Sequence, residues 1–215
     1  MKTSIALKVL LGAGALTLPL MALAESNFQT GAATNSPGAT AHVDFSIVIP
    51  KILYLRVGTG SSYTTGALTS VNTVDLITFS PAAGTVGNGT AVAGTGGDLT
   101  GGVETAAIVS NSGSVTLVAT NSATGLSDGA ATPDFIPFSQ ITTAATTLTS
   151  GTALPAPILS ATGTSVGVVL TAPPTKLISQ DAKWTYSFAN SASVPAGNYG
   201  GVANSGRVTY TATMP

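Results

Sequence analysis

The sequence predicts an all-β fold, an antiparallel β-sandwich of about eight or nine strands. Three observations support this class. Short segments alternate apolar and polar residues with a period of two, and 25 glycines and 12 prolines punctuate the chain between them. Beyond the N-terminus, no stretch keeps the 3.6-residue period of a helix. The 215 residues suffice for one sizeable β domain.

Residues 1–24 have the three-part layout of a cleaved secretory signal peptide. Lys2 and Lys8 precede an apolar stretch, and Ala22-Leu23-Ala24 then forms a small-x-small cleavage site. The apolar stretch is too short and too interrupted for a spanning helix, which needs about 20 residues, and a retained N-terminal anchor is the alternative. We therefore expect an exported protein in the periplasm, at the cell surface or outside the cell, with no transmembrane segment in the mature chain.

The mature chain is expected to consist of an arm and one domain. Residues 25–40 are small and polar apart from Phe28, which predicts a flexible N-terminal arm. A single β-sandwich domain is expected over residues 41–215.

Ala41–Ile49 predicts the first strand, because its apolar residues alternate along the chain. The residues on its apolar face are Val43, Phe45, Ile47 and Ile49. Pro50 has no N–H to donate to a strand ladder. Ile52–Val57 therefore either continues this strand after a bend or forms the next one.

Four further segments are predicted as strands before the end of the chain. They are Val71–Phe79, Val103–Ser110, Ser114–Thr120 and Ser165–Thr171. Asn111-Ser112-Gly113 predicts a hairpin turn between Val103–Ser110 and Ser114–Thr120. Residues 82–102 are rich in glycine and predict a long loop or a weak edge, and residues 141–152 remain ambiguous.

Residues 184–215 hold the single Trp and the clearest alternation in the chain. Trp184, Tyr186 and Phe188 share one face of a segment that begins at Lys183. Residues 207–212 alternate in the same way around Tyr210. We expect these two segments to form the final antiparallel pair of the sheet.

Composition narrows the range of functions. Without the two leader lysines, 5 basic and 8 acidic residues remain, which argues against nucleic acid as a partner. Charged residues make up only 7% of the chain, far below the roughly 25% of ordinary soluble domains, and this is typical of exported structural proteins. The chain has no Cys, which excludes disulfides, thiol catalysis and thiolate metal sites.

Two polar groups are candidates for a site, and both have a plainer interpretation. His42 and Asp44 share a strand face and could bind a metal or act in acid–base catalysis, but an exposed polar face is the better interpretation. Asp98 and Glu104 flank a Gly-rich stretch that could surround Ca²⁺, although their number and spacing favour an ordinary loop. We expect no catalytic, cofactor-binding or metal-binding residues and no cofactor.

The aromatic residues near the C-terminus allow two interpretations. They are Trp184, Tyr186, Phe188, Tyr199 and Tyr210. Exposed rings would provide a platform on which a carbohydrate stacks. The period-two placement of the first three favours packing in a core between two sheets.

The run Val194-Pro-Ala-Gly-Asn-Tyr199-Gly and the alternating last strand resemble the closing strands of fimbrial subunits of the chaperone–usher type from Gram-negative bacteria. The chain also resembles exported β-sandwich proteins of such bacteria that have no assigned role. The fimbrial resemblance implies an immunoglobulin-like sandwich that polymerises when an extended arm of one subunit completes the sheet of the next. It also implies a periplasmic chaperone and an usher as partners. Ala41–Ile49 is the better donor in this chain, since residues 25–40 offer only Phe28 as a large apolar residue.

We therefore expect a non-enzymatic, exported structural or adhesion-type protein, a fimbrial-like subunit that assembles with itself by strand addition. The alternative is a periplasmic or cell-surface binding module for carbohydrate or another ligand. A hydrolase is a third hypothesis, but no G-x-S-x-G motif marks a nucleophile.

Overall fold

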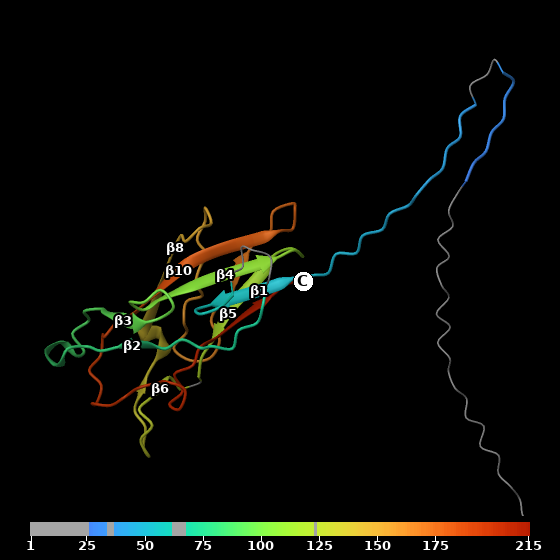
Figure 1. The fold of residues 1–215 in the computed structure, drawn as a ribbon. Helices are drawn as coiled ribbons and strands as arrows, with labels where there is room; N and C mark the ends of the chain where they lie inside the picture. Colours follow the sequence, from blue (N-terminus) through green and yellow to red (C-terminus); the bar gives the residue numbers. More distant parts are fainter. Residues whose placement is uncertain (1–25, 34–36, 62–67, 123) are drawn as a thin grey trace, which may run out of the picture. The chain divides into compact units, whose positions relative to one another are not determined.

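The computed structural model describes residues 26–33, 37–61, 68–122 and 124–215. Two units make up the chain, Met1–Ile49 and Pro50–Pro215. The expected signal peptide lies outside the described residues. In the first unit, the described residues form no helix or strand, and Figure 1 draws them without an arrow.

The second unit is essentially all-β, which confirms the predicted class. Its described residues form eleven strands and two short 3₁₀ helices. The strands are β1 (Leu53–Val57), β2 (Ile77–Phe79), β3 (Val92–Gly96), β4 (Val103–Ser110), β5 (Val115–Thr120), β6 (Leu126–Ser127), β7 (Phe135–Ile136), β8 (Ile141–Thr146), β9 (Val168–Leu170), β10 (Ile178–Phe188) and β11 (Thr209–Thr213). The 3₁₀ helices are Ala83–Thr85 and Phe138–Gln140. Among the described residues, no helix has the length and apolar character needed to cross a membrane.

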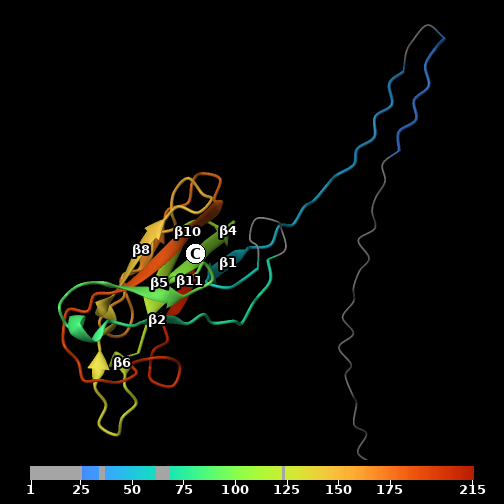
Figure 2. The ribbon, with the colours of Figure 1, turned by 60° about the vertical axis from the view of Figure 1, so that its left-hand side comes forward.

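The named strands pair antiparallel and form three sheets. In the largest, the order is β1-β4-β10-β3-β2, and β8 also pairs with β10. β11, β5 and β9 form a second sheet, and β6 pairs with β7. β4, β10 and β8 run side by side in both ribbon views (Figure 1, Figure 2).

The two larger sheets share one core. Its buried residues come from β4 and β10 of the first sheet, from β5 and β9 of the second, and from Leu154 in the loop between β8 and β9. They include Ile108, Trp184, Val115 and Leu170. β4 is buried on both faces, as expected for a central strand covered on each side.

Most of the predicted segments form strands, but two predicted pairings are wrong. β4 and β5 do not form a hairpin, because Asn111-Ser112-Gly113 carries the chain from one sheet to the other. β10 and β11 do not pair either. Their aromatic side chains meet across the core instead, where the Tyr186 and Tyr210 hydroxyls lie 2.9 Å apart and the Trp184 and Tyr210 rings 5.2 Å apart.

Three other segments differ from the expectation in extent. Only Ile77–Phe79 of the predicted strand Val71–Phe79 forms a strand. The Gly-rich stretch 82–102 contains β3, which pairs with β10 on one side and, over three residues, with β2 on the other. The ambiguous residues 141–152 contain β8, which pairs with β10 over six residues.

Candidate functional site

The segment Ala41–Ile49 is the most unusual surface in the described chain. It is extended and exposed throughout, and it belongs to no strand. Phe45 is 90% exposed and Ile47 84%, and Val43 and Ile49 are exposed as well. Side chains of this size are seldom left in water in such an unbroken alternating row. The expected strand is therefore not formed within the chain, although its amphipathic pattern is present.

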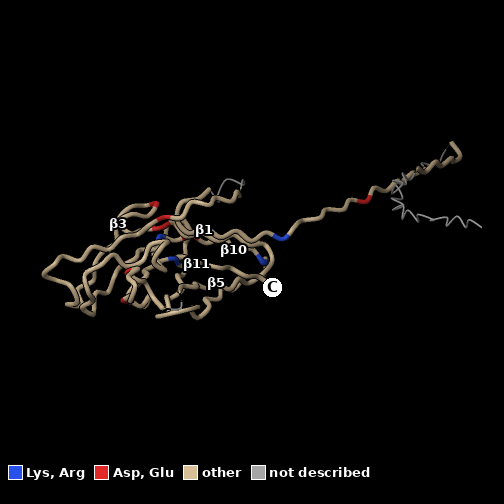
Figure 3. The backbone as a smooth tube through the Cα atoms, turned by 90° about the horizontal axis from the view of Figure 1, so that it is seen from below, with Lys and Arg blue, Asp and Glu red and all other residues tan. Residues whose placement is uncertain are grey.

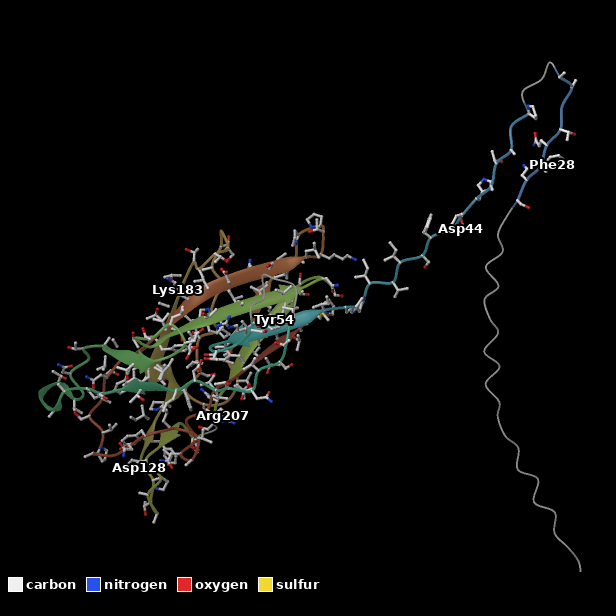
Figure 4. All side chains as sticks on the ribbon, viewed as in Figure 1. Phe28, Asp44, Tyr54, Asp128, Lys183 and Arg207 are labelled. Atoms are coloured by element: carbon white, nitrogen blue, oxygen red, sulfur yellow. The ribbon has the colours of Figure 1, made fainter. Side chains whose placement is uncertain are left out.

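The polar face of the same segment holds the two residues considered for acid–base or metal chemistry. His42 and Asp44 are both exposed. Figure 4 labels Asp44 on the extended segment, whose side chains point alternately to its two sides. The groups of three or more metal-ligating side chains found among the described residues do not include either residue.

A groove runs beside β1. β1 pairs with β4 along one edge, and no described strand pairs with its other edge. The groove has a volume of about 540 Å³ and is lined by all of β1 and by residues 68–73. A sheet edge with unpaired backbone groups is a template for an additional strand.

Three carboxylates gather at the end of β1. Asp75, Asp98 and Glu104 offer oxygens that all lie within 4.8 Å of one another. The Arg56 guanidinium donates to Asp98 Oδ2 at 2.8 Å. The Thr59 backbone N–H donates to Asp75 Oδ2 at 2.5 Å. Figure 3 shows how few other charged residues the described chain carries.

Glu104 is the buried member of this cluster, with 4% of its surface exposed. Burial, together with the neighbouring charges of Asp75 and Asp98, raises the pKa of Glu104 to about 8. Its carboxyl is therefore protonated at neutral pH. Gly58 lies against it with φ +82°, and any side chain there would collide with Asp75 and Glu104.

The cluster is better suited to holding loops together than to binding a cation. Asp98 is already paired with the Arg56 guanidinium, and Asp75 already accepts from the N–H and the hydroxyl of Thr59. Asp98 also accepts from the Thr105 N–H at 2.7 Å. The contacts join β1, β4 and the loops at residues 58–59, 75 and 98. Asp98 and Glu104 were identified from the sequence, whereas Asp75 was missed because nothing in its spacing links it to them.

The aromatic residues near the C-terminus are mostly core. Trp184 is fully buried, and its Nε1–H donates to the Leu154 carbonyl at 2.8 Å. Tyr186 and Phe188 are also buried. Burial raises the pKa of Tyr210 to about 12, because the charged form would lose its hydration. The packing interpretation is confirmed, and these three residues form no exposed platform for a carbohydrate.

Comparison with protein families, with curated proteins and with solved structures found no match for this chain.

Proposed function

We propose that this chain is a non-enzymatic, exported structural subunit of the fimbrial-like type, which assembles when the segment Val43–Ile49 of one subunit adds as a strand to another. The proposal includes an immunoglobulin-like sandwich for Pro50–Pro215, which the shared core of the two larger sheets supports. A periplasmic chaperone and an usher are the accessory partners that the fimbrial resemblance implies.

The exposed apolar row is the observation that carries this proposal. Burying a side chain of the size of Val, Ile or Phe contributes about 1.5–3 kcal/mol. Four such residues on one face of the segment therefore offer about 6–12 kcal/mol before the entropy of ordering is subtracted. The described residues do not bury the segment, which is exposed throughout. A partner that pairs with the segment would gain this free energy.

The low charge of the chain agrees with this role. Only 7% of the residues are charged, so a row of contacts between copies meets little electrostatic repulsion. Carbohydrate binding was the alternative, and it loses its main support because Trp184 is buried.

Size-exclusion chromatography and negative-stain microscopy of the mature chain test the proposal. We expect polymers from the wild type and only monomers from a Phe45→Asp/Ile47→Asp variant, because charges on the apolar face cannot be buried. Val48→Asp is the matched control. It lies on the opposite face of the same segment, so this variant should still polymerise. A wild type that stays monomeric at high concentration would refute assembly by strand addition.

A further inference from the structure

We propose that the acceptor is the groove along the free edge of β1, and that its occupant is Val43–Ile49 of a second copy of this chain. The inference rests on the strand addition proposed above and adds the place and the partner. Its support comes from the edge itself, from the walls of the groove and from the contacts of Pro50 and Ile52.

The edge of β1 has the backbone groups that an added strand needs. The five residues of β1 pair one-to-one with β4, from Leu53 opposite Ser110 to Val57 opposite Ala106. In an antiparallel strand, successive residues direct their N–H and C=O groups to alternate edges. About half of these groups therefore face the groove, where no described strand receives them.

The walls of the groove combine polar residues with apolar side chains that are incompletely covered. Leu53, Leu55 and Val57 pack against the core from β1. On the other side, Val71 is 45% exposed, and Val74 and Leu76 just beyond the groove are 65% and 67% exposed. An inserted strand would cover such residues and extend the inner layer of side chains. The apolar face of Val43–Ile49 would then lie in the same layer of side chains as Leu53, Leu55 and Val57.

The charge in the groove does not oppose an apolar strand. Arg56 is the single charged residue among those that line it, in the described part of the chain. Its guanidinium is already engaged with Asp98 at 2.8 Å and with the Gly58 carbonyl at 2.7 Å. An apolar side chain that enters the groove would therefore not bury an unpaired charge.

Contacts at the start of β1 disfavour a tight hairpin between the arm and its own β1. The side chain of Asn111 binds the residues on both sides of Lys51. Its Nδ2 donates to the Pro50 carbonyl and its Oδ1 accepts from the Ile52 N–H, each at 2.8 Å. The Asn111 N–H also donates to the Ile52 carbonyl at 3.3 Å. A tight hairpin between Ile49 and Ile52 would need these same Ile52 groups.

Proline excludes that hairpin for a second reason. The favoured two-residue turns place the first central residue at positive φ, whereas the Pro ring holds φ near about −65°. Pro50 would occupy this position. A two-residue hairpin between the arm and its own β1 is thus disfavoured, which favours the β1 edge of another copy as the partner.

Disulfide cross-linking tests the inference in a chain that contains no Cys. One preparation of the mature chain carries Tyr54→Cys on the outward face of β1. The other carries a single Cys at Asp44, Ser46 or Val48, on the outward face of the arm. Directly opposite Cα atoms in neighbouring strands lie about 4.5–5.5 Å apart, within the range that a disulfide spans.

We expect a disulfide-linked heterodimer from the mixed preparations for at least one of the three arm positions. Thr142→Cys is the matched control on β8, another strand with a groove beside it, of about 300 Å³. It should give at least tenfold less heterodimer. If Tyr54→Cys impairs folding, as judged by circular dichroism, Ser70→Cys on the opposite wall of the groove replaces it.

Three results would overturn the inference. They are no heterodimer at either wall of the β1 groove, equal cross-linking to β8, or a disulfide within one molecule when arm and β1 cysteines are combined in a dilute monomer. Polymers that form without cross-links at β1 would leave strand addition intact and place it at another edge. A mature chain that never assembles would refute both proposals.

Discussion

At the scale of single residues, Glu104 makes the folded state sensitive to pH. Its pKa rises from 4.5 to about 8 on folding, chiefly because the carboxyl is buried. The folded protein therefore holds a proton that the unfolded chain releases above about pH 4.5. Linkage requires stability to fall as pH increases wherever the folded state binds more protons. The contribution of Glu104 is fully present below pH 4.5 and is lost between about pH 4.5 and pH 8.

Glu104→Gln should remove this dependence, because Gln keeps a hydrogen-bonding side chain and does not titrate. We expect the variant to be more stable than the wild type at pH 8 by on the order of 3 kcal/mol, and nearly equal to it at pH 4. Urea unfolding at both pH values measures the difference. Asp134→Asn, at an exposed carboxylate, is the control and should change neither curve. An unchanged pH profile in Glu104→Gln would contradict the assigned pKa.

Single residues also show where prediction from the sequence succeeds. Trp184 and Phe188 were expected in the core because a period of two places them on one face, and the structure confirms this. Asp75 could not be linked to Asp98 and Glu104, because a carboxylate in a polar loop looks the same whether or not the fold brings it to others. Whether Asp75 lies beside Asp98 and Glu104 depends on the whole fold, which also decides that Glu104 is buried.

At the scale of elements, β10 organises the second unit. It pairs with β4, β8 and β3 along its eleven residues. Its side chains also hold the loop that follows β8. The buried Asp181 accepts hydrogen bonds from the Thr149 and Ser150 N–H groups at 2.9 and 2.7 Å. Trp184 binds the Leu154 carbonyl further along the same loop.

Asp181→Ala should destabilise the protein by roughly 2–4 kcal/mol, because two backbone N–H groups lose a charged acceptor. Chemical denaturation followed by tryptophan fluorescence measures the loss. Asp128→Ala tests a carboxylate that also accepts from backbone N–H groups, at 3.1 and 3.2 Å, but at a half-buried position, and it should cost less than half as much. Equal effects would show that the buried position of Asp181 is not what matters.

Elements were easier to predict than their partners. The alternation in Lys183–Phe188 and in residues 207–212 indicates two strands correctly. It cannot say whether they pair in one sheet or face each other across a core, since both arrangements bury the same faces. β3 was not predicted as a strand because its glycines give no alternation of side chains, whereas strand pairing needs only backbone groups. Alternation in Ala41–Ile49 likewise indicates a strand-forming segment and leaves its partner open.

At the scale of the whole molecule, the chain has an exposed apolar segment and also a sheet in which no described strand pairs with one edge of β1. Val43–Ile49 is exposed in the structure, and the groove beside β1 contains apolar side chains that are partly uncovered. Each copy would thus offer both a donor and an acceptor. A contact of this head-to-tail kind repeats from one copy to the next and generates a filament unless the rotation closes a ring.

Hydrogen exchange of the backbone amides in Val43–Ile49 tests this account most directly. In the assembled protein we expect these amides to be protected at least a hundredfold relative to the monomeric Phe45→Asp/Ile47→Asp variant, because they would form ladder hydrogen bonds with another copy. Amides of residues 26–33 serve as an internal control and should exchange rapidly in both. Fast exchange of Val43–Ile49 in the assembled protein would contradict the account.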